Sequence, residues 1–291
     1  MDLKAYLKER GGRVNQFLDE VIGRGSISPV DDAMRYSVMA GGKRLRPILL
    51  MAAADCVGGD GTRYLPVAAG LEMIHTYSLI HDDLPEMDND DYRRGRLTNH
   101  KVFGHAMAVL AGDGLQSQAF EVMLGQTGVA PEKLIEVVKL VAHCAGPFGM
   151  DGGQALDITS EGKKLTLAQM QQLHEAKTGA LFVASIRGGA ILGGGSEEEI
   201  ATLTKFARLF GLAFQITDDI LDVEGDEAVM GKKAGMDALM NKSTYVTLFS
   251  LEKAKEMAKE TLEEARRTLS PFGAKAEVLT AITEHLYNRK K

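Results

Sequence analysis

Apolar residues recur at steps of three and four positions along almost the whole chain, which is the period of an amphipathic α-helix. The pattern begins at residues 5–22, "AYLKERGGRVNQFLDEVI", and is still present at residues 276–291. No segment shows a sustained alternation of apolar and polar residues, so no β-strand is predicted. The sequence therefore predicts an all-α protein in which about ten helices form a bundle.

Glycine and proline residues separate the helical segments. They stand at Gly41–Gly42, Gly58–Gly59, Pro131, Pro147, Gly193–Gly195 and Pro271–Gly273. Pro47 and Pro131 suit the first turn of a helix, where the missing N–H group costs no hydrogen bond. No linker, repeat or low-complexity tract divides the chain, so residues 1–291 are predicted to form a single domain.

Composition and charge narrow the classes of function. The chain has 291 residues, of which 45 % are hydrophobic and 25 % charged, and its net charge is -6. Binding to nucleic acid is not expected from this balance, and no apolar run approaches the roughly 18 residues that membrane insertion needs. The N-terminus lacks the apolar core of a signal peptide. Cys56 and Cys144 lie far apart without metal-ligand spacing, which indicates reduced thiols and a cytoplasmic protein.

A dense group of acidic residues follows one apolar segment. Residues 78–100, "SLIHDDLPEMDNDDYRRGRLTNH", hold five aspartates and one glutamate within ten positions. Asp82 and Asp83 end the apolar helical run, and Asp88 follows from the turn. Carboxylates this close repel one another, so this cluster requires cations nearby.

A second acidic cluster of similar form lies far downstream, in "FQITDDILDVEGD". Asp218 and Asp219 are adjacent, and Asp222 lies four residues after Asp218, on the same face of a helix. Mg²⁺ takes oxygen ligands and usually shares its coordination shell with substrate phosphates. The two clusters together predict a magnesium site, although two solvated acidic helix ends would also produce this pattern.

Basic residues indicate what such metals would hold. Arginine and lysine bind phosphate oxygens, arginine as a planar fork and lysine as a point charge. Any one of these bases is more often a surface residue, but together with the acidic clusters they predict two diphosphates, one bound through Mg²⁺ and one directly. The candidate bases are Lys43, Arg44, Arg46, Arg93, Arg94, Lys177, Lys232, Lys233 and Lys242.

Two other kinds of phosphate site fit less well. "GGKR" fails as a nucleotide-binding loop, because Ser37 stands where that loop needs glycine and Arg44 follows Lys43 where it needs serine or threonine. The pair His81–Asp82 is typical of a metal-dependent phosphohydrolase. That site needs further histidine ligands, however, and it leaves the second acidic cluster without a role.

The motifs resemble those of the trans-isoprenyl diphosphate synthases, specifically the bacterial-type farnesyl diphosphate synthases. "HDDLPEMDNDDYRRG" is similar to the first aspartate-rich motif of that family, and "FQITDDILD" to the second. "GGKRLRP", "VFGHAMAVLAGD", "GMDGGQALD" and "KTGAL" also match in order. The resemblance covers most of the chain. It implies a single polyprenyl synthetase domain of the isoprenoid synthase fold, around a deep central cavity and usually in a homodimer.

The resemblance also implies a reaction. Isopentenyl diphosphate would condense head-to-tail (1′-4) with dimethylallyl or geranyl diphosphate, giving farnesyl diphosphate and diphosphate. It implies three Mg²⁺ ions in the active site, for which Mn²⁺ substitutes. The allylic C–O bond would ionise, and cations would stabilise the diphosphate that leaves.

Residue by residue, the resemblance implies the following roles. The metal ligands are Asp82, Asp83, Asp88, Asp218, Asp219 and Asp222. The allylic substrate contacts are Arg93, Lys177, Thr178, Gln215, Lys232 and Lys242. The isopentenyl diphosphate contacts are Lys43, Arg46, His75 and Arg94. The residues implied in catalysis are Asp82, Asp83, Asp88, Lys177, Thr178, Gln215, Asp218 and Lys232.

Three further positions admit two interpretations each. A glycine after Thr178 either bends that helix, turning its carbonyls toward the reacting cation, or allows close packing. Gln154 and Asp157, three residues apart, either face the cavity or form a hydrogen-bonded pair behind it.

Product length is predicted from the residues before Asp82. Tyr77 and Ser78 precede Asp82 by five and four positions, and five helical residues rise about 7.5 Å. In the family, an aromatic residue at this place goes with a fifteen-carbon product. Tyr77 is alternatively a core tyrosine facing another helix. Residues 89–104 also resemble geranylgeranyl diphosphate synthases, so a geranylgeranyl or a geranyl product is the alternative.

Three rival classes of protein fit the motifs less well. A class I terpene cyclase shares the fold and the first motif, but usually carries an Asn/Ser/Glu-type second motif and does not need "GGKRLRP". A non-catalytic subunit of a synthase would be expected to lack one aspartate motif, and both are intact. A purely structural helical protein explains neither acidic cluster.

Overall fold

The computed structural model describes residues 1–22, 28–224 and 243–287, and these residues are almost entirely helical. The first half contains α1 (Leu3–Val21), α2 (Val30–Val38), α3 (Leu45–Cys56), the 3₁₀ turn η1 (Gly61–Tyr64), α4 (Leu65–Asp82), α5 (Asn99–Phe103) and α6 (His105–Leu124). Next come α7 (Pro131–Ala145), α8 (Met150–Ser160), α9 (Leu167–His174), the π-helical turn η2 (Glu175–Gly179), α10 (Ala180–Leu192) and α11 (Glu197–Glu224). The last elements are α14 (Tyr245–Leu248), α15 (Leu251–Thr268), the 3₁₀ turn η3 (Ser270–Ala276) and α16 (Glu277–Tyr287). The prediction of an all-α fold is confirmed.

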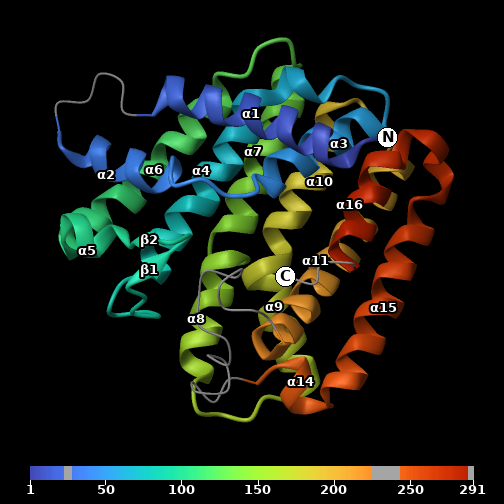
Figure 1. Ribbon diagram of the computed structural model, residues 1–291. Helices are drawn as coiled ribbons and strands as arrows, with labels where there is room; N and C mark the ends of the chain where they lie inside the picture. Colours follow the sequence, from blue (N-terminus) through green and yellow to red (C-terminus); the bar gives the residue numbers. More distant parts are fainter. Residues whose placement is uncertain (23–27, 225–242, 288–291) are drawn as a thin grey trace.

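Two apolar helices, α4 and α10, form the centre of the bundle. α4 packs against α3 and α6, while α10 packs against α3, α7 and α11 (Figure 1). Small residues allow these helices to approach closely: a Cβ on Gly70 of α4 would lie 2.5 Å from Cγ of Met123 on α6. α15 and α16 cover one side of the bundle, where α15 packs along α11. Because most residues of α4 are buried, burial rather than amphipathicity determines its central place.

One ion pair is buried in this centre. Arg44, in the left-handed conformation with φ 48°, precedes α3, and its Nη1 donates to Oε1 of Glu72 on α4 at 2.7 Å. Its Nε and Nη2 donate to Asn15 and to the carbonyl of Val38 at 2.7 and 2.6 Å. Both charged side chains are 2 % exposed. Arg44 was one of the candidate phosphate-binding bases, but it is a structural residue that anchors the "GGKRLRP" segment to α1 and α4.

A short hairpin departs from the prediction that no strand is present. β1 (Tyr92–Arg93) pairs with β2 (Arg96–Leu97), with Arg93 opposite Arg96. Arg94 and Gly95 form its two-residue loop, with φ of 53° and 73°. Two positive φ angles are the geometry of a type I′ turn, which matches the twist of the flanking strands. The strands are too short to show alternation in the sequence.

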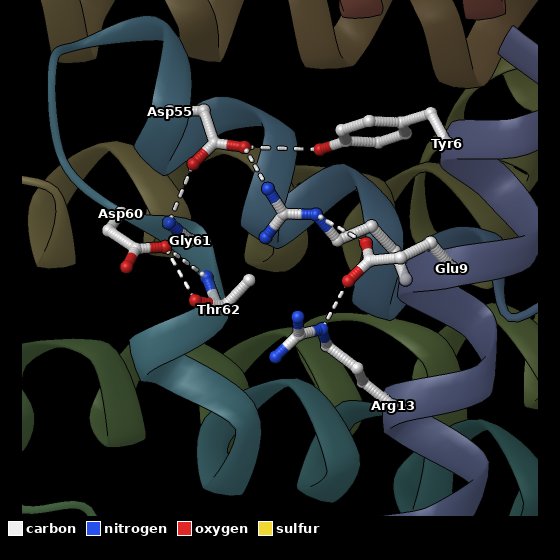
Figure 2. A network of polar contacts seen from close by, with 8 residues as sticks. Tyr6, Glu9, Arg13, Asp55, Asp60, Gly61 and Thr62 are labelled. Carbon is white, nitrogen blue, oxygen red and sulfur yellow. Dashed lines mark hydrogen bonds and ion pairs between the residues drawn. The ribbon is translucent and has the colours of Figure 1, made fainter. Parts of the chain in front are cut away.

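A polar network fastens the N-terminal helix to the far end of α3 (Figure 2). Asp55 accepts hydrogen bonds from the Tyr6 hydroxyl and from Nη2 of Arg10, both at 3.1 Å. Its other oxygen accepts from the backbone N–H of Gly61 at 2.7 Å. One carboxylate thus joins α1, α3 and η1, on the side of the bundle away from the acidic clusters. No helix among the described residues is long and apolar enough to cross a membrane.

Replacing Glu72 tests how much the buried Arg44–Glu72 pair contributes to the stability of the fold. In Glu72→Ala, Arg44 keeps its charge inside the core without a carboxylate, which costs about 3–5 kcal/mol of unfolding free energy. The matched control is Glu264→Ala, which removes an exposed pair with Lys205 and costs less than about 1 kcal/mol. Urea unfolding monitored by circular dichroism measures both, and equal losses would contradict a structural role for the buried pair.

Candidate active site

One large cavity opens between α4, α8, η2 and α11. Counted out to the solvent at its mouth, it contains about 2580 Å³ of empty space. Asp82 and Asp88 line it from the end of α4 and the following turn, and Asp218, Asp219 and Asp222 line it from α11. Two clusters that are far apart in the sequence therefore face the same space.

The first acidic cluster lies where α4 ends. The backbone N–H of Asp88 donates to the carbonyl of Asp82 at 2.9 Å, so the chain folds back over the end of the helix. Burial raises the pKa of Asp82 to about 6, and the nearby Lys177 only partly opposes this rise. The protein alone leaves Asp82 with too little positive charge beside it to keep its pKa at the ordinary value, and a bound cation would supply that charge.

Asp83 has different surroundings from its neighbour. Its Oδ1 lies 2.6 Å from Nε and 2.5 Å from Nη2 of Arg93, which the hairpin presents to it. Burial raises the pKa of Asp83 to about 6 against the effect of this hydrogen bond. Asp83 is 3 % exposed and does not line the large cavity, whereas Arg93 does. The structure thus places Asp83 behind Arg93, whose Nη2 also lies 3.5 Å from Oδ2 of Asp90.

A chain of hydrogen bonds runs through the second cluster. The Thr178 hydroxyl donates to Oε1 of Gln215 at 3.1 Å, and Nε2 of Gln215 donates to Oδ1 of Asp219 at 2.9 Å. Oδ2 of Asp219 accepts from the backbone N–H of Tyr245 at 2.9 Å. The amide of Gln215 therefore has its two ends fixed, and η2, α11 and α14 are joined through side chains.

The "KTG" segment forms a π-helical turn between α9 and α10. A widened turn of this kind interrupts the regular α-helical hydrogen bonding and is frequent at functional sites. At this turn Nζ of Lys177 lies 2.5 Å from Oδ2 of Asp157 on α8. The glycine of the turn also packs tightly, because a Cβ on Gly211 of α11 would lie 3.1 Å from Cα of Gly179. The widened turn and this close approach are both present, while the predicted turning of the carbonyls toward a reacting cation stays a prediction.

Basic residues gather on another wall of the cavity. Arg46, His75 and Arg94 line it together, and the Arg94 guanidinium donates to the carbonyl of Gly41. Burial lowers the pKa of Arg46 to about 10, and its guanidinium lies 4.9 Å from the ring centre of Phe182. Burial also lowers the pKa of His75 well below 6.5, so this imidazole is neutral at neutral pH.

Lys43 and the glycine before it complete the "GGK" loop. Lys43 is exposed and is not among the residues that line the cavity. Gly42 has φ of 121°, and a Cβ there would lie 2.7 Å from the Arg94 guanidinium. Glycine is therefore required where the loop passes this arginine. The predicted contacts Lys232 and Lys242 lie outside the described residues.

The two residues predicted to set product length also lie on the cavity wall. Tyr77 is 4 % exposed, and its ring packs edge-to-face on His81 with ring centres 5.8 Å apart. Its hydroxyl donates to Oδ1 of Asp151 on α8 at 2.8 Å. The Ser78 hydroxyl donates to the carbonyl of His75 at 2.9 Å. Tyr77 therefore lines the cavity and also packs against another helix, as the alternative had it, and its role in product length stays a prediction.

The donor set suits a hard divalent cation. Carboxylate oxygens converge from two helices, and such oxygens are the ligands that Mg²⁺ prefers. Within residues 1–22, 28–224 and 243–287, no three His, Cys, Asp or Glu side chains are grouped closely enough to hold a metal alone. This arrangement fits a metal that takes one or two carboxylates and completes its shell with substrate phosphates and water.

Comparison with known proteins shows to which of the predicted classes of protein the chain belongs. The family model for polyprenyl synthetase matches residues 28–284. The chain belongs to the polyprenyl synthetase family. The prediction of a prenyltransferase is thereby confirmed, together with the isoprenyl synthase type of all-α fold.

Individual relatives match over most or all of their length. The chain is 45 % identical to farnesyl diphosphate synthase from Geobacillus stearothermophilus, over 98 % of this chain and 97 % of the relative. It is also 45 % identical to the chloroplastic geranylgeranyl pyrophosphate synthase of Capsicum annuum, over 99 % of this chain and 79 % of the relative. The crystal structure of an FPP/GFPP synthase from Zymomonas mobilis matches with a TM-score of 0.89 and 37 % identity, covering 98 % of this chain and 99 % of the other. Because relatives of equal identity carry both names, overall similarity does not determine the product.

Two partners of the polyprenyl synthetase site were not predicted. Gln154 and Asp157 were expected either to face the cavity or to pair with each other; both line the cavity, and Asp157 also pairs with Lys177, which was not predicted. Asp151 was not singled out, although it holds the Tyr77 hydroxyl. Both contacts join α8 to distant helices, and nothing in the spacing of the residues indicates them.

Proposed function

We propose that this polyprenyl synthetase condenses isopentenyl diphosphate with dimethylallyl and then geranyl diphosphate, giving farnesyl diphosphate. The observation that carries the proposal is one cavity that is lined by acidic residues, by basic residues and by a buried tyrosine ring. Two acidic clusters face each other across it, Arg46, His75 and Arg94 form a basic wall, and Tyr77 lies about one and a half helical turns below Asp82. The alternative is a geranylgeranyl product, which the names of several relatives favour.

The acidic clusters would hold the allylic diphosphate through Mg²⁺. Asp82, Asp88 and Asp218 line the cavity and are the proposed ligands, supported by Asp222. When bound, three Mg²⁺ ions, or Mn²⁺ in their place, would neutralise the charge that develops on the departing diphosphate. Asp83 and Asp219, predicted as ligands too, already accept protein hydrogen bonds. We propose that these two act by positioning Arg93 and Gln215.

The π-helical turn would serve the allylic substrate directly. Lys177 lines the cavity, and Asp157 holds its ammonium group in place. Thr178 and Gln215 present their polar groups in a fixed direction, because each is hydrogen-bonded to the next. Arg93 would contact the same diphosphate, and the resemblance assigns Lys232 and Lys242 to it as well. A preformed set of donors of this kind loses little reorganisation energy as the C–O bond ionises.

The basic wall would hold isopentenyl diphosphate directly. Arg46 and Arg94 provide planar guanidinium groups, which bind phosphate through paired hydrogen bonds. Neutral His75 would act as a hydrogen-bond donor rather than as a charge. Lys43 would reach the same diphosphate from the loop rim. The isopentenyl double bond then attacks the allylic cation, and the proton lost afterwards passes to the released diphosphate.

Tyr77 would end the growth of the product. Its buried ring lies on the face of α4 that leads away from Asp82, next to Ser78. A tail that begins at the diphosphate and runs along α4 meets this ring after about 7.5 Å. The ring would therefore stop growth after one or two additions.

A second copy of the chain is the proposed partner. Four large apolar residues of α5 and α6 are 41–55 % exposed. They are Val102, Val109, Leu110 and Leu124. We propose that residues 1–291 are a single polyprenyl synthetase domain that pairs through this face into a homodimer. The two cysteines are unpaired and buried, which supports a place in the reducing cytoplasm.

The metal assignment predicts a loss of turnover. Asp82→Ala and Asp218→Ala each remove a proposed ligand and should lower kcat by about 100-fold or more. Far-UV circular dichroism should stay unchanged, because both side chains face the cavity. Asp32→Ala, an exposed change on α2, is the control. The assay is product chromatography. For the wild-type protein, removal of metal by a chelator should abolish activity, and added Mg²⁺ should restore it. Near-normal turnover in Asp82→Ala or Asp218→Ala would contradict the metal assignment.

The length assignment predicts a longer product from Tyr77→Ala. Removing the ring opens apolar depth, and a tail gains about 0.8 kcal/mol for each CH₂ group it buries there. The main product should shift from fifteen carbons to twenty or more, measured at a fixed ratio of substrates. An unchanged fifteen-carbon product would mean that another wall sets the length. A wild-type protein that already makes twenty carbons would establish the geranylgeranyl alternative.

The homodimer predicts twice the chain mass of 31.5 kDa in sedimentation velocity. Leu110→Arg places a charge in the proposed interface and should give monomers, because burying an unpaired charge is strongly unfavourable. Leu167→Arg changes another exposed leucine, on α9, and should leave the dimer intact. A monomeric wild-type protein would refute the proposal, and so would a Leu110→Arg variant that still forms dimers.

A further inference from the structure

The Tyr77 hydroxyl links α4 to α8 through a hydrogen bond. It donates to Oδ1 of Asp151 at 2.8 Å, although the two residues are 74 positions apart in the sequence. Both side chains line the large cavity. The Tyr77 and Asp151 side chains are therefore joined by a hydrogen bond that links α4 to α8 at the cavity wall.

Other groups around the ring hold it less directionally. His81, one turn later on α4, packs against the ring edge. The Gln116 side chain of α6 lies near the same hydroxyl and slightly opposes the rise of its pKa. Burial and the Asp151 carboxylate both raise the pKa of Tyr77 well above its ordinary value, so the phenol stays protonated and donates a hydrogen bond to Asp151. The phenol thus lies among side chains of three helices, and Asp151 is its acceptor on α8.

Asp151 stands on a rigid support. A Cβ on Gly153 of α8 would lie 2.2 Å from the backbone nitrogen of Lys177, so α8 packs directly on η2. A Cβ on Gly149 would lie 2.1 Å from the carbonyl oxygen of Cys144, so the start of α8 is fixed against α7. These contacts require glycine on both sides of Asp151. The carboxylate cannot move away from Tyr77 with the helix that carries it.

We propose that Asp151 is a specificity-determining residue, which positions Tyr77 across the cavity and so helps to limit product length. The inference rests on the proposed role of Tyr77 as the end of the cavity. Without an acceptor on α8, the ring is free to turn about χ1 into another staggered position. Depth along α4 would then open for part of the time, and longer products would form beside the fifteen-carbon one.

Four variants test whether the hydrogen bond itself limits product length. Asp151→Ala removes the acceptor, and Tyr77→Phe removes the donor while keeping the ring. Asp151→Asn removes the charge but keeps an acceptor oxygen. Thr159→Ala, an exposed change on the same helix outside the cavity lining, is the control. Circular dichroism verifies that each variant is folded. The measurement is the ratio of twenty- to fifteen-carbon product at equal conversion, which does not depend on total activity.

The expected pattern follows from the hydrogen bond. Asp151→Ala and Tyr77→Phe should each raise the ratio by about fivefold, the order of magnitude that one hydrogen bond contributes to an equilibrium. The double variant should not exceed the larger single effect, because both changes break the same contact. Asp151→Asn and Thr159→Ala should stay near the wild-type ratio.

Other outcomes would overturn the inference in distinguishable ways. If both Asp151 variants lengthen the product while Tyr77→Phe does not, the charge of Asp151 acts and not its hydrogen bond. If Tyr77→Ala lengthens the product but Tyr77→Phe and Asp151→Ala do not, packing alone holds the ring, and only the role of Asp151 fails. If Tyr77→Ala also leaves fifteen carbons, the proposed role of Tyr77 fails, and the role of Asp151 fails with it.

Discussion

The burial of carboxylates beside one shared cavity is the constraint on which the rest of this structure depends. Two helices, α4 and α11, present acidic clusters to one cavity, and burial raises the pKa of Asp82 and of Asp83 to about 6. Lys177 and Arg93 offset only part of that cost. The folded protein therefore holds these carboxylates in an environment that disfavours their charged form, and the proposed divalent cation would relieve this cost.

Maintaining that arrangement requires rigid walls. The buried pair of Arg44 and Glu72 ties the loop before α3 to α4, and glycine contacts allow α4 and α6 to pack closely. On the other side, hydrogen bonds link Thr178, Gln215 and Asp219 across η2 and α11. Each link crosses between helices, so the carboxylates cannot separate without breaking interactions in the core or in the cavity wall.

One helix, α4, bears both the first acidic cluster and the tyrosine proposed to limit product length. α4 ends in the first acidic cluster, and its preceding turns supply His75 to the basic wall and Tyr77 to the inner cavity. A helix has a constant rise per residue, so on the proposed function the number of positions between Asp82 and Tyr77 would set the distance from the diphosphate to the ring. Such a spacing would limit product length only if the ring keeps its orientation, and the Tyr77 hydroxyl is held by Asp151 of α8.

The sequence by itself determined the helices, the family and the acidic residues that line the cavity, because these depend on local patterns: a period of 3.6 residues, aspartates at helix ends, and motifs in order. Tertiary structure decided where the predicted residues lie and which contacts they make. Arg44 proved to be a buried anchor, Asp83 lies behind Arg93, and Lys177 pairs with Asp157. It also decided the Tyr77–Asp151 contact and the two-residue hairpin turn. Contacts of this kind join residues from different helices or depend on backbone angles, and the position of one helix beside another is fixed only when the whole core packs.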